Sequence, residues 1–184
     1  PLSVSLFNNV YYHRIPVNGR ERRMHLARFL YPLDALNGWN RIYGKRGFYQ
    51  FQCVLPDSSS AAGLEKLLDE IRRSRAASFL AVLKTLGSEG PGYLSFPQRG
   101  YTLALDFPRK PGVRDLMNRL ERITLEYGGR IYLAKDACVS AEGFQTMYPK
   151  LDRYRSVLEA IDPDQHMNSD MARRLRIRAE GSPI

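Results

Sequence analysis

The sequence predicts an α+β fold, in which a ferredoxin-like (split βαβ) antiparallel sheet carries its helices on one face and precedes a helical C-terminal segment. Two observations lead to this prediction. Strand and helix patterns follow the order β-α-β, loop, β-α-β between residues 47 and 134, and the two halves have similar lengths. After residue 134 the patterns are helical. Such a sheet leaves one face free for a ligand or a second domain.

The first strand, residues 47–55, indicates what the free face carries. Its side chains alternate, and one face is apolar enough to pack on helices: Tyr49, Phe51, Cys53 and Leu55. The other face carries Phe48, Gln50, Gln52 and Val54. Because glutamine favours the surface, two amides in mid-strand indicate either a solvated face or the polar floor of a pocket. From this stretch alone the solvated face is the better interpretation.

The other elements of the repeat follow from periodicity and turn residues. Apolar residues at i, i+3, i+4 and i+7 predict a helix over residues 59–75: Leu64, Leu67, Leu68 and Ile71. Strands are predicted over residues 78–86, 101–107 and 130–134, with a glycine- and proline-rich loop over residues 87–100. A second helix begins near Pro111 and ends at Gly128-Gly129. Its apolar stripe is Val113, Leu116, Met117, Leu120, Ile123 and Tyr127.

The flanking segments differ in character. Before the repeat we expect strands over residues 1–12 and 26–31, a turn over 13–23, and a loop over 32–44 that contains Trp39. After it we expect a short helix over residues 140–147, a second over 151–161, and a last ordered stretch over 169–175. Because the sheet is complete without this tail, the tail is expected to contact another part of a longer protein.

Composition limits the possible classes of protein. The 184 residues suffice for one domain, or one domain and an appendage, and the chain starts at Pro1 as a piece of a longer protein would. No apolar run is long enough to span a membrane, and no signal peptide is visible. The widely separated Cys53 and Cys138 indicate a reduced chain without a metal site. The net charge of +9 suits an anionic ligand, a lipid surface or a nucleic acid.

Two lysines are candidates for chemistry. Lys135 follows the fourth predicted strand, where it could bind an anion or stabilise developing negative charge; alternatively it is exposed or paired with Asp136. Lys84 interrupts an apolar strand, and a pocket and a solvent-open edge are equally good interpretations. The histidines His13, His25 and His166 lack partners at ligand spacing, which favours surface or structural roles.

A ferredoxin-like RNA-binding module is the alternative function. Arg46-Gly47-Phe48 matches the start of an RNA-recognition octapeptide. The match then fails, since Tyr49 replaces a small residue and Gln50 replaces a stacking aromatic. The motif also falls on the first strand of the unit rather than the third. RNA binding is therefore a distant alternative, and no nucleic acid is expected.

Several blocks between Phe29 and Ile177 carry a resemblance to a known family. They are Phe29–Asp34, Trp39–Gly44, Gly47–Gln52, Asp106–Pro108, Tyr127–Tyr132, Ala134–Asp136, Met147–Pro149 and Ser169–Leu175. In this order they resemble the C-terminal part of the FAD-linked oxidases of the vanillyl-alcohol oxidase superfamily, in its aldonolactone-oxidase-like branch. Within that branch the chain is most similar to the decaprenylphosphoryl-ribose oxidases of cell-wall arabinan synthesis.

The resemblance implies one part of a two-domain flavoprotein. Residues 1–129 would belong to the substrate (cap) domain, and residues 130–184 would return to the FAD-binding domain. That N-terminal domain, with its glycine-rich loops, is absent from this sequence and would hold most of the FAD. The implied reaction is oxidation of a sugar secondary hydroxyl by hydride transfer to flavin. The fragment alone is expected to bind FAD weakly and to be inactive.

The resemblance also implies site residues and partners. Lys135 would be catalytic, the substrate-binding residues would be Gln50, Gln52, Lys84, Thr102 and Tyr132, and the cofactor-binding residues would be Tyr132, Ala134 and Lys135. The chain departs from the family at Thr102, Ala104 and Leu86, where asparagine, cysteine and phenylalanine are found. The expected partners are a sugar or polyprenyl-phosphate sugar, the FAD domain and a reductase. The expected location is the cytoplasm or the inner membrane face, with the periplasm as an alternative.

Overall fold

The computed structural model describes residues 2–19, 21–31, 37–38, 41, 43–76, 78 and 80–178. The chain separates into two compact units, Pro1–Lys45 and Arg46–Ile184, and each is described by itself. Among the described residues, no helix is both long enough and apolar enough to cross a membrane.

The first unit is helical where strands were predicted. It contains α1, Leu2–His13, and α2, Leu26–Leu30, so the strands predicted over residues 1–12 and 26–31 are wrong. Val10-Tyr11-Tyr12 favours a strand by propensity, but a strand needs a partner for its backbone groups, whereas a helix satisfies them locally. No strand lies among the described residues of this unit. Between the helices the described residues form turns, as predicted, while much of the loop at 32–44, with Trp39, lies outside the described part.

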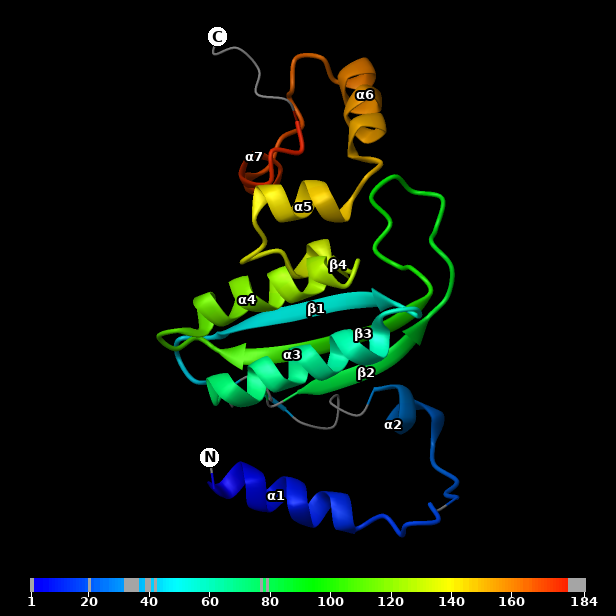
Figure 1. Ribbon diagram of the computed structural model, residues 1–184, viewed down its shortest axis with the longest axis vertical. Coiled ribbons are helices and arrows are strands. Elements are labelled where there is room, and N and C mark those ends of the chain that lie inside the picture. Colours follow the sequence, from blue (N-terminus) through cyan, green and yellow to red (C-terminus); the bar gives the residue numbers. More distant parts are fainter. Residues whose placement is uncertain are drawn as a thin grey trace. The chain divides into compact units, whose positions relative to one another are not determined.

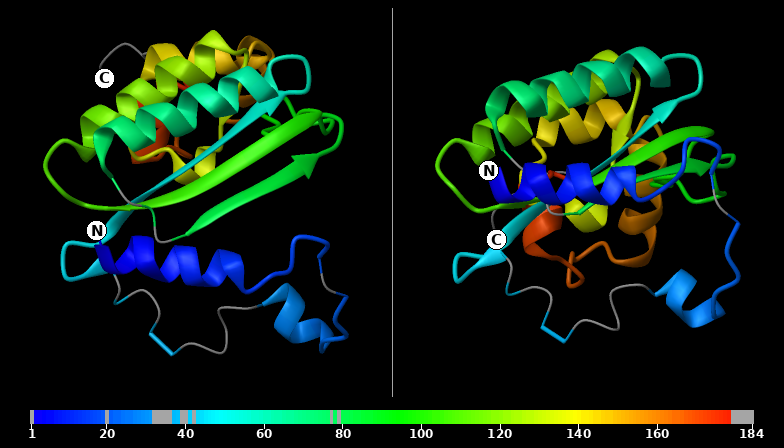
Figure 2. Two further views of the ribbon diagram at one scale, coloured as in Figure 1. Left: turned by 60° about the horizontal axis from the view of Figure 1, so that its bottom comes forward. Right: turned by 90° about the horizontal axis from the view of Figure 1, so that it is seen from below.

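The second unit has the predicted split βαβ topology. Its strands are β1, Phe48–Pro56; β2, Ala81–Leu86; β3, Gly100–Pro108; and β4, Arg130–Ile131. They pair antiparallel in the order β2-β3-β1-β4. The connecting helices are α3, Ser60–Ser74, and α4, Val113–Glu126. Both lie on the same face of the sheet (Figures 1 and 2). The α+β prediction is therefore confirmed.

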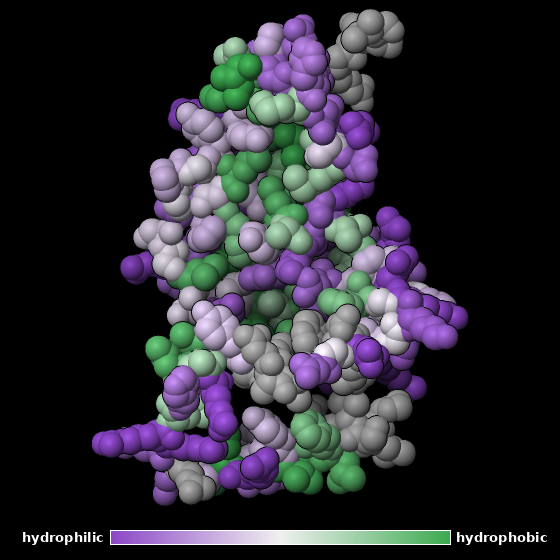
Figure 3. Space-filling model, turned by 180° about the vertical axis from the view of Figure 1, so that it is seen from behind, coloured by the Kyte–Doolittle hydropathy of each residue, from purple (hydrophilic) through white to green (hydrophobic). Residues whose placement is uncertain are grey.

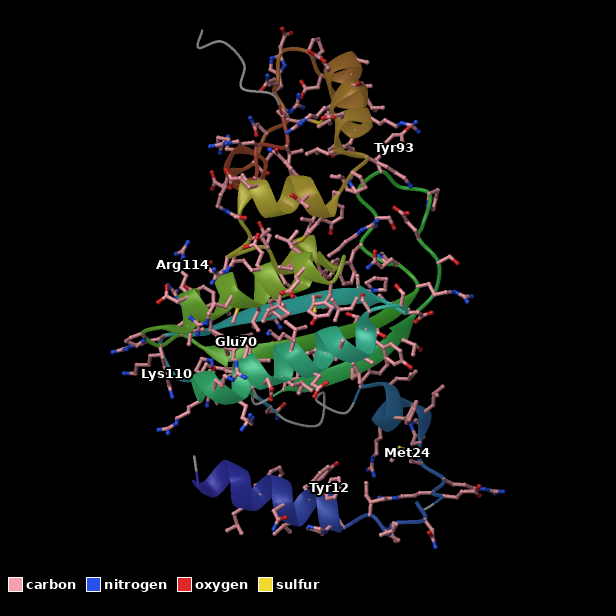
Figure 4. All side chains as sticks on the ribbon, viewed as in Figure 1. Tyr12, Met24, Glu70, Tyr93, Lys110 and Arg114 are labelled. Atoms are coloured by element: carbon pink, nitrogen blue, oxygen red, sulfur yellow. The ribbon has the colours of Figure 1, made fainter. Side chains whose placement is uncertain are left out.

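The core lies between this sheet and its two helices. It contains inward side chains of β1, as predicted, and of β3, together with residues of the helical stripes: Phe51, Cys53, Leu55, Leu103, Leu105, Phe107, Leu67, Leu116 and Leu120. One member of the predicted stripe is wrong, because Leu68 is 52% exposed. Glu70 of α3, labelled in Figure 4, forms an ion pair of 2.6 Å with Arg119 of α4 and joins the two helices.

The fourth strand is shorter than predicted. It ends at Ile131, and residues Leu133–Lys135 form a 3-10 turn, η2. The Tyr132 N–H still donates to the Gln52 carbonyl (2.8 Å), and the Lys135 N–H then donates to the Tyr132 carbonyl (2.8 Å). The chain thus turns away from β1 after Tyr132, and Lys135 is carried by this turn rather than by a strand end. The predicted strand over 78–86 likewise begins only at Ala81.

Glycines allow the close approach that precedes β4. Gly128 has a φ of +67° at the end of α4, which favours glycine. A Cβ on Gly129 would lie 2.5 Å from the Val54 carbonyl oxygen. The predicted role of Gly128-Gly129 as the stop of the second helix is confirmed.

The C-terminal segment packs against the sheet unit. Its helices are α5, Ala141–Met147; α6, Leu151–Ile161; and α7, Asp170–Arg174. Ser140 and Ser169 cap α5 and α7, since their hydroxyls accept from Gly143 N (2.9 Å) and Ala172 N (3.1 Å). Buried residues of this segment join the core: Phe144, Met147, Tyr148, Leu151, Leu175 and Ile177. The predicted helices are confirmed, and contact of this tail with another part of a longer protein stays a prediction.

Candidate functional site

The strand register places the predicted polar residues on one face. Gln50 lies opposite Asp106 and Val54 opposite Thr102, while Thr102 lies opposite Lys84. Paired residues of antiparallel strands share a face, and this is the face that α3 and α4 leave free. We call the set Gln50, Gln52, Lys84, Thr102 and Asp106 the polar face. The expectation that Gln50, Gln52 and Lys84 share the free face is confirmed. Figure 3, drawn from the side opposite to Figure 1, shows hydrophilic and hydrophobic residues mixed on this side of the unit.

A chain of hydrogen bonds brings Lys135 to the polar face. The Lys135 ammonium donates to Gln50 Oε1, and Gln50 Nε2 donates to Asp106 Oδ1 at 3.0 Å. Asp106 is only 2% exposed, and its backbone N–H is shared between Ser78 Oγ (3.0 Å) and the Leu80 carbonyl (3.3 Å). Sequence reasoning missed Asp106 as a site residue. The signal was a carboxylate in mid-strand, in the same alternation as Thr102.

The remaining polar-face residues lie on the central strands β1 and β3, which we call the floor, or on the edge strand β2. Gln52 Nε2 donates to Thr102 Oγ1 at 3.2 Å, across the diagonal between β1 and β3. Thr102 is buried, with 1% of its surface exposed. Lys84 is exposed on β2, the strand at the edge of the sheet. For Lys84 the structure therefore shows the solvent-open edge position.

The residues around η2 form an open rim beside the floor. Tyr132 is 37% exposed, and its ring lies 4.8 Å, centroid to centroid, from that of Phe96 in the loop between β2 and β3. Ala134 is exposed and Lys135 is half-buried. An aromatic ring, a small side chain and an ammonium group thus occur together at this rim.

Arg174 of α7 holds the segment that follows the rim. It donates to the Asp136 carboxylate, to the Asp136 carbonyl (2.9 Å) and to the Val139 carbonyl (2.7 Å). Asp136 is therefore the partner of Arg174, and this pairing replaces the expected alternative of a Lys135–Asp136 pair. Sequence reasoning quoted Arg174 within a family block but assigned it no role in holding the Lys135 turn.

Arg130 of β4 anchors the loop that carries Phe96. Its guanidinium donates to the Ser95 carbonyl (2.8 Å) and to Glu89 Oε1 (3.2 Å), and Lys150 lies 3.3 Å from the same oxygen. Burial by itself would raise the pKa of Glu89, but the hydrogen bonds and charges of Lys150 and Arg130 outweigh it and hold the pKa below its ordinary range. Arg130 thus holds this loop next to the rim at Tyr132.

The remaining side chains of a reactive or metal-binding kind are the cysteines and histidines. Burial raises the pKa of the Cys53 thiol to about 12, so this thiol is protonated at neutral pH. Cys138 is half-buried, and burial raises the pKa of its thiol as well. His13 and His25 lie in the first unit, and His166 lies 3.6 Å from Asp162. Within the described ranges no cluster of His, Cys, Asp and Glu could hold a metal ion.

The second unit thus carries Lys135 on the η2 turn beside a polar sheet face, and comparison with known proteins shows what the chain is similar to. Residues 101–175 match the family model of D-arabinono-1,4-lactone oxidase. These residues cover β3, α4, β4, η2 and the tail as far as Leu175. The resemblance to the FAD-linked oxidases of the aldonolactone-oxidase-like branch is confirmed, and the chain is related to sugar and lactone oxidases.

Individual relatives agree with this class. Decaprenylphosphoryl-beta-D-ribose oxidase of Mycolicibacterium smegmatis is 40% identical over 158 residues, which are 86% of this chain and 34% of that protein. An uncharacterized protein of Streptomyces coelicolor is 34% identical over 144 residues, 78% of this chain and 39% of its own. L-gulono-1,4-lactone dehydrogenase of Mycobacterium tuberculosis is 22% identical over 130 residues, 70% of this chain and 30% of its own. The chain therefore spans between 30% and 39% of the length of these relatives.

Proposed function

We propose that this chain is the C-terminal, substrate-domain part of an FAD-dependent oxidoreductase that oxidises a sugar secondary hydroxyl. The observation that carries the proposal is the Lys135 ammonium, held by Gln50 at the border between the polar face and the rim at Tyr132. The similarity to a decaprenylphosphoryl-ribose oxidase, to the D-arabinono-1,4-lactone oxidase family and to a gulonolactone dehydrogenase supports an oxidoreductase.

The rim residues fit an FAD that is held mainly by an N-terminal domain. Lys135 offers an ammonium to carbonyl or anionic oxygens, Ala134 has a small side chain, and Tyr132 offers an exposed aromatic side chain. These three residues would contact the cofactor. When bound, the flavin would supply the redox chemistry by accepting a hydride from the alcohol carbon.

The residues of the chain itself would bind and orient the sugar. A sugar presents hydroxyl groups that both donate and accept, and the amides of Gln50 and Gln52 and the hydroxyl of Thr102 match them on the floor. Lys135 would place a fixed positive charge where negative charge develops during oxidation, and such preorganised charges lower the barrier. Lys84, at the open edge, would orient the substrate from the side and suits an anionic group.

The substrate we favour is a polyprenyl-phosphate-linked ribose. The 40% identity to an oxidase named for such a sugar supports this choice over an aldonolactone, whose named dehydrogenase is 22% identical. The net charge of +9 suits an anionic lipid-phosphate and a peripheral position at the inner face of the membrane. In this proposal residues 130–184 lead back to the FAD domain, and a reductase consumes the oxidised sugar.

An RNA-binding module remains the second candidate, and the sheet argues against it. RNA-binding sheets stack bases on aromatic side chains of their central strands. On the free face β3 presents Thr102, Ala104 and Asp106. No observation favours this function over the oxidase.

Flavin content tests the proposal. Purified residues 1–184 are expected to carry little FAD, whereas a longer protein that contains this chain should be yellow and should lose its flavin absorbance on addition of a polyprenyl-phosphate ribose. The oxidase assignment would be wrong if that longer protein binds no flavin. Tight, salt-sensitive binding of single-stranded RNA by residues 1–184 would favour the second candidate.

A further inference from the structure

The chain of hydrogen bonds that ends at Asp106 has a direction. The Lys135 ammonium can only donate, and the Asp106 carboxylate, when ionised, can only accept. Gln50 stands between them and does both, with its oxygen toward Lys135 and its nitrogen toward Asp106. A carboxamide turned the other way would place its NH2 group against the ammonium and its oxygen against the carboxylate.

Because Asp106 and Gln50 are largely shielded from water, the orientation of the Gln50 amide affects the strength of both of its hydrogen bonds. Asp106 is 2% exposed, and Gln50 is half-buried, so neither group can exchange its partner freely for water. A hydrogen bond at low dielectric is stronger than in water, and a lost partner is correspondingly costly. The β1–β3 ladder fixes the two residues opposite each other, so the carboxylate approaches the amide from a rigid strand. Lys135, by contrast, is carried by the η2 turn and has a long, rotatable side chain.

We propose that Asp106 is a positioning residue for Lys135 in the oxidation proposed above, and that it acts through Gln50. The carboxylate orients the Gln50 amide, and the oriented amide oxygen holds the ammonium over the polar face. Without Asp106 the amide can turn, and Lys135 loses a fixed acceptor. The inference thus deepens the proposed function and depends on it.

A purely structural role for Asp106 predicts something different. The Asp106 N–H donates to Ser78 Oγ and to the Leu80 carbonyl, and in a purely structural role the carboxylate would serve only the junction between β2 and β3. Its loss would then lower stability, and its effect on the reaction would be independent of Gln50 and Lys135. If Asp106 has only a structural role, the effects of changing Asp106 and of changing Gln50 or Lys135 on the reaction should add. If Asp106 acts through Gln50, these effects should not add.

A double-mutant cycle in the FAD-loaded, full-length protein tests the proposal. Asp106→Leu is expected to slow flavin reduction at saturating substrate roughly 10- to 100-fold, the scale of one hydrogen bond to a charged group. In a Gln50→Leu or a Lys135→Ala background the same change should have no more than about a threefold effect, because the chain is already broken. Asp106→Asn, which keeps the shape and one acceptor oxygen, should lie between Asp106→Leu and the parent and serves if the leucine variant does not fold.

Two further measurements keep the outcomes distinct. In the parent protein, NMR of the Gln50 side-chain amide should report a hydrogen-bonded NH2 group whose signals shift in Asp106→Asn. Glu121→Gln is the matched control, since Glu121 is a buried carboxylate (5% exposed) on α4 that accepts from Ser140. It should lower stability and leave flavin reduction unchanged.

Two results would overturn the positioning role of Asp106. One is that Asp106→Leu slows flavin reduction by the same factor in the parent, Gln50→Leu and Lys135→Ala backgrounds. The other is an unchanged rate of flavin reduction in both Asp106→Leu and Asp106→Asn. An unchanged rate in Lys135→Ala would overturn the role of Lys135, whereas a parent protein whose flavin is not reduced by the sugar would overturn the proposed function itself.

Discussion

At the scale of single residues, the proposed function of this chain depends on which positions of the sheet carry polar side chains. Gln50, Gln52 and Thr102 occupy mid-strand positions at which an apolar residue would pack equally well on a covering layer. Each of them is hydrogen-bonded across the sheet, to Asp106 or to one another. The described side chains include no buried nitrogen or oxygen without a partner. The face is therefore preorganised, and a ligand meets groups whose positions are already fixed.

Lys84 gives the first prediction. Because it lies at the exposed edge of the sheet, it should contribute to binding rather than to the reaction step. Lys84→Ala in the full-length enzyme is expected to raise the apparent KM roughly tenfold and to change the rate at saturating substrate by less than about threefold. Lys66→Ala, an exposed lysine on α3, is the control and should change neither value. A large loss of rate at saturation with an unchanged KM would contradict this role.

The local sequence pattern could predict the two glutamines of the polar face but not the residues that hold the site in place. The alternation in residues 47–55 was enough to place both glutamines on one face, because a strand allows only two directions for its side chains. Asp106 obeys the same rule, but its importance depends on the pairing of β1 with β3, which periodicity does not supply. The partner of Asp136 is Arg174, 38 residues further along the chain. Only the folded tail brings those two residues together.

At the scale of elements, the tail holds the turn that carries Lys135. Arg174 of α7 donates to Asp136 and Val139, which both belong to the segment that follows η2. The Tyr148 hydroxyl, at the end of α5, donates to the Ile131 carbonyl of β4 (2.8 Å), and burial raises the pKa of this phenol. The short β4 strand and its turn are thus fixed by helices that follow them in the chain.

Adjacent arginines give the second prediction. Arg174→Ala should lower the free energy of unfolding by about 1–3 kcal/mol, because it removes hydrogen bonds to a carboxylate and to backbone carbonyls. Arg173→Ala should change it by less than about 0.5 kcal/mol, since Arg173 is exposed and its ion pair is with the fully exposed Asp170. Urea denaturation of both variants measures the difference. Equal losses would show that the Arg174 contacts contribute nothing beyond a surface charge.

Asp162 gives a prediction about pH. Burial by itself would raise the pKa of this carboxyl, but the N–H groups of Met167 and His166 and the charge of Arg178 lower it below its ordinary value of 3.8. A depressed pKa in the folded state means that the ionised carboxylate stabilises the fold above about pH 4, and that this contribution is lost as the pH falls through the lower, folded-state pKa.

Substitution should remove that dependence. Asp162→Asn is expected to be less stable than the parent at pH 7, and the gap between the two proteins should shrink as the pH falls below about 4. Urea midpoints at pH 7 and near pH 3 test this expectation. Asp170→Asn, which changes a fully exposed carboxylate, should follow the parent at both pH values. A gap between Asp162→Asn and the parent that stays constant with pH would contradict the assignment.

The elements themselves were predictable to different degrees. Between residues 47 and 134 the periodicity was clear because each element buries one face, and the split βαβ order followed from it. In the first unit the same kinds of residue, such as Tyr11, Tyr12 and Phe29, are exposed on helices. Apolar and aromatic content therefore indicated strands where no packed sheet exists among the described residues. The end of β4 was also missed, since the turn at η2 depends on hydrogen bonds from Tyr132 and Lys135 rather than on composition.

At the scale of the whole molecule, we infer that this chain supplies one part of a site that a second domain completes. The chain spans between 30% and 39% of the length of the relatives named above, and its candidate residues lie on the sheet face that α3 and α4 leave uncovered and on the rim at η2. In the proposed enzyme the FAD domain closes this rim, and the substrate enters between the cofactor and the polar face. Lys135 is the residue that links both sides, because it contacts the floor at Gln50 and lies on the turn that the family resemblance places against the flavin.

The most direct test is the rate of flavin reduction in the full-length protein, measured by rapid mixing with saturating sugar substrate. Lys135→Ala is expected to lower this rate roughly ten- to a thousandfold, the scale of losing one electrostatic group that acts in the transition state. The fold should survive, since Lys135 lies outside the apolar stripes of α3 and α4. Flavin bleaching at the parental rate in Lys135→Ala would contradict the account and leave Lys135 as a surface lysine bound to Gln50.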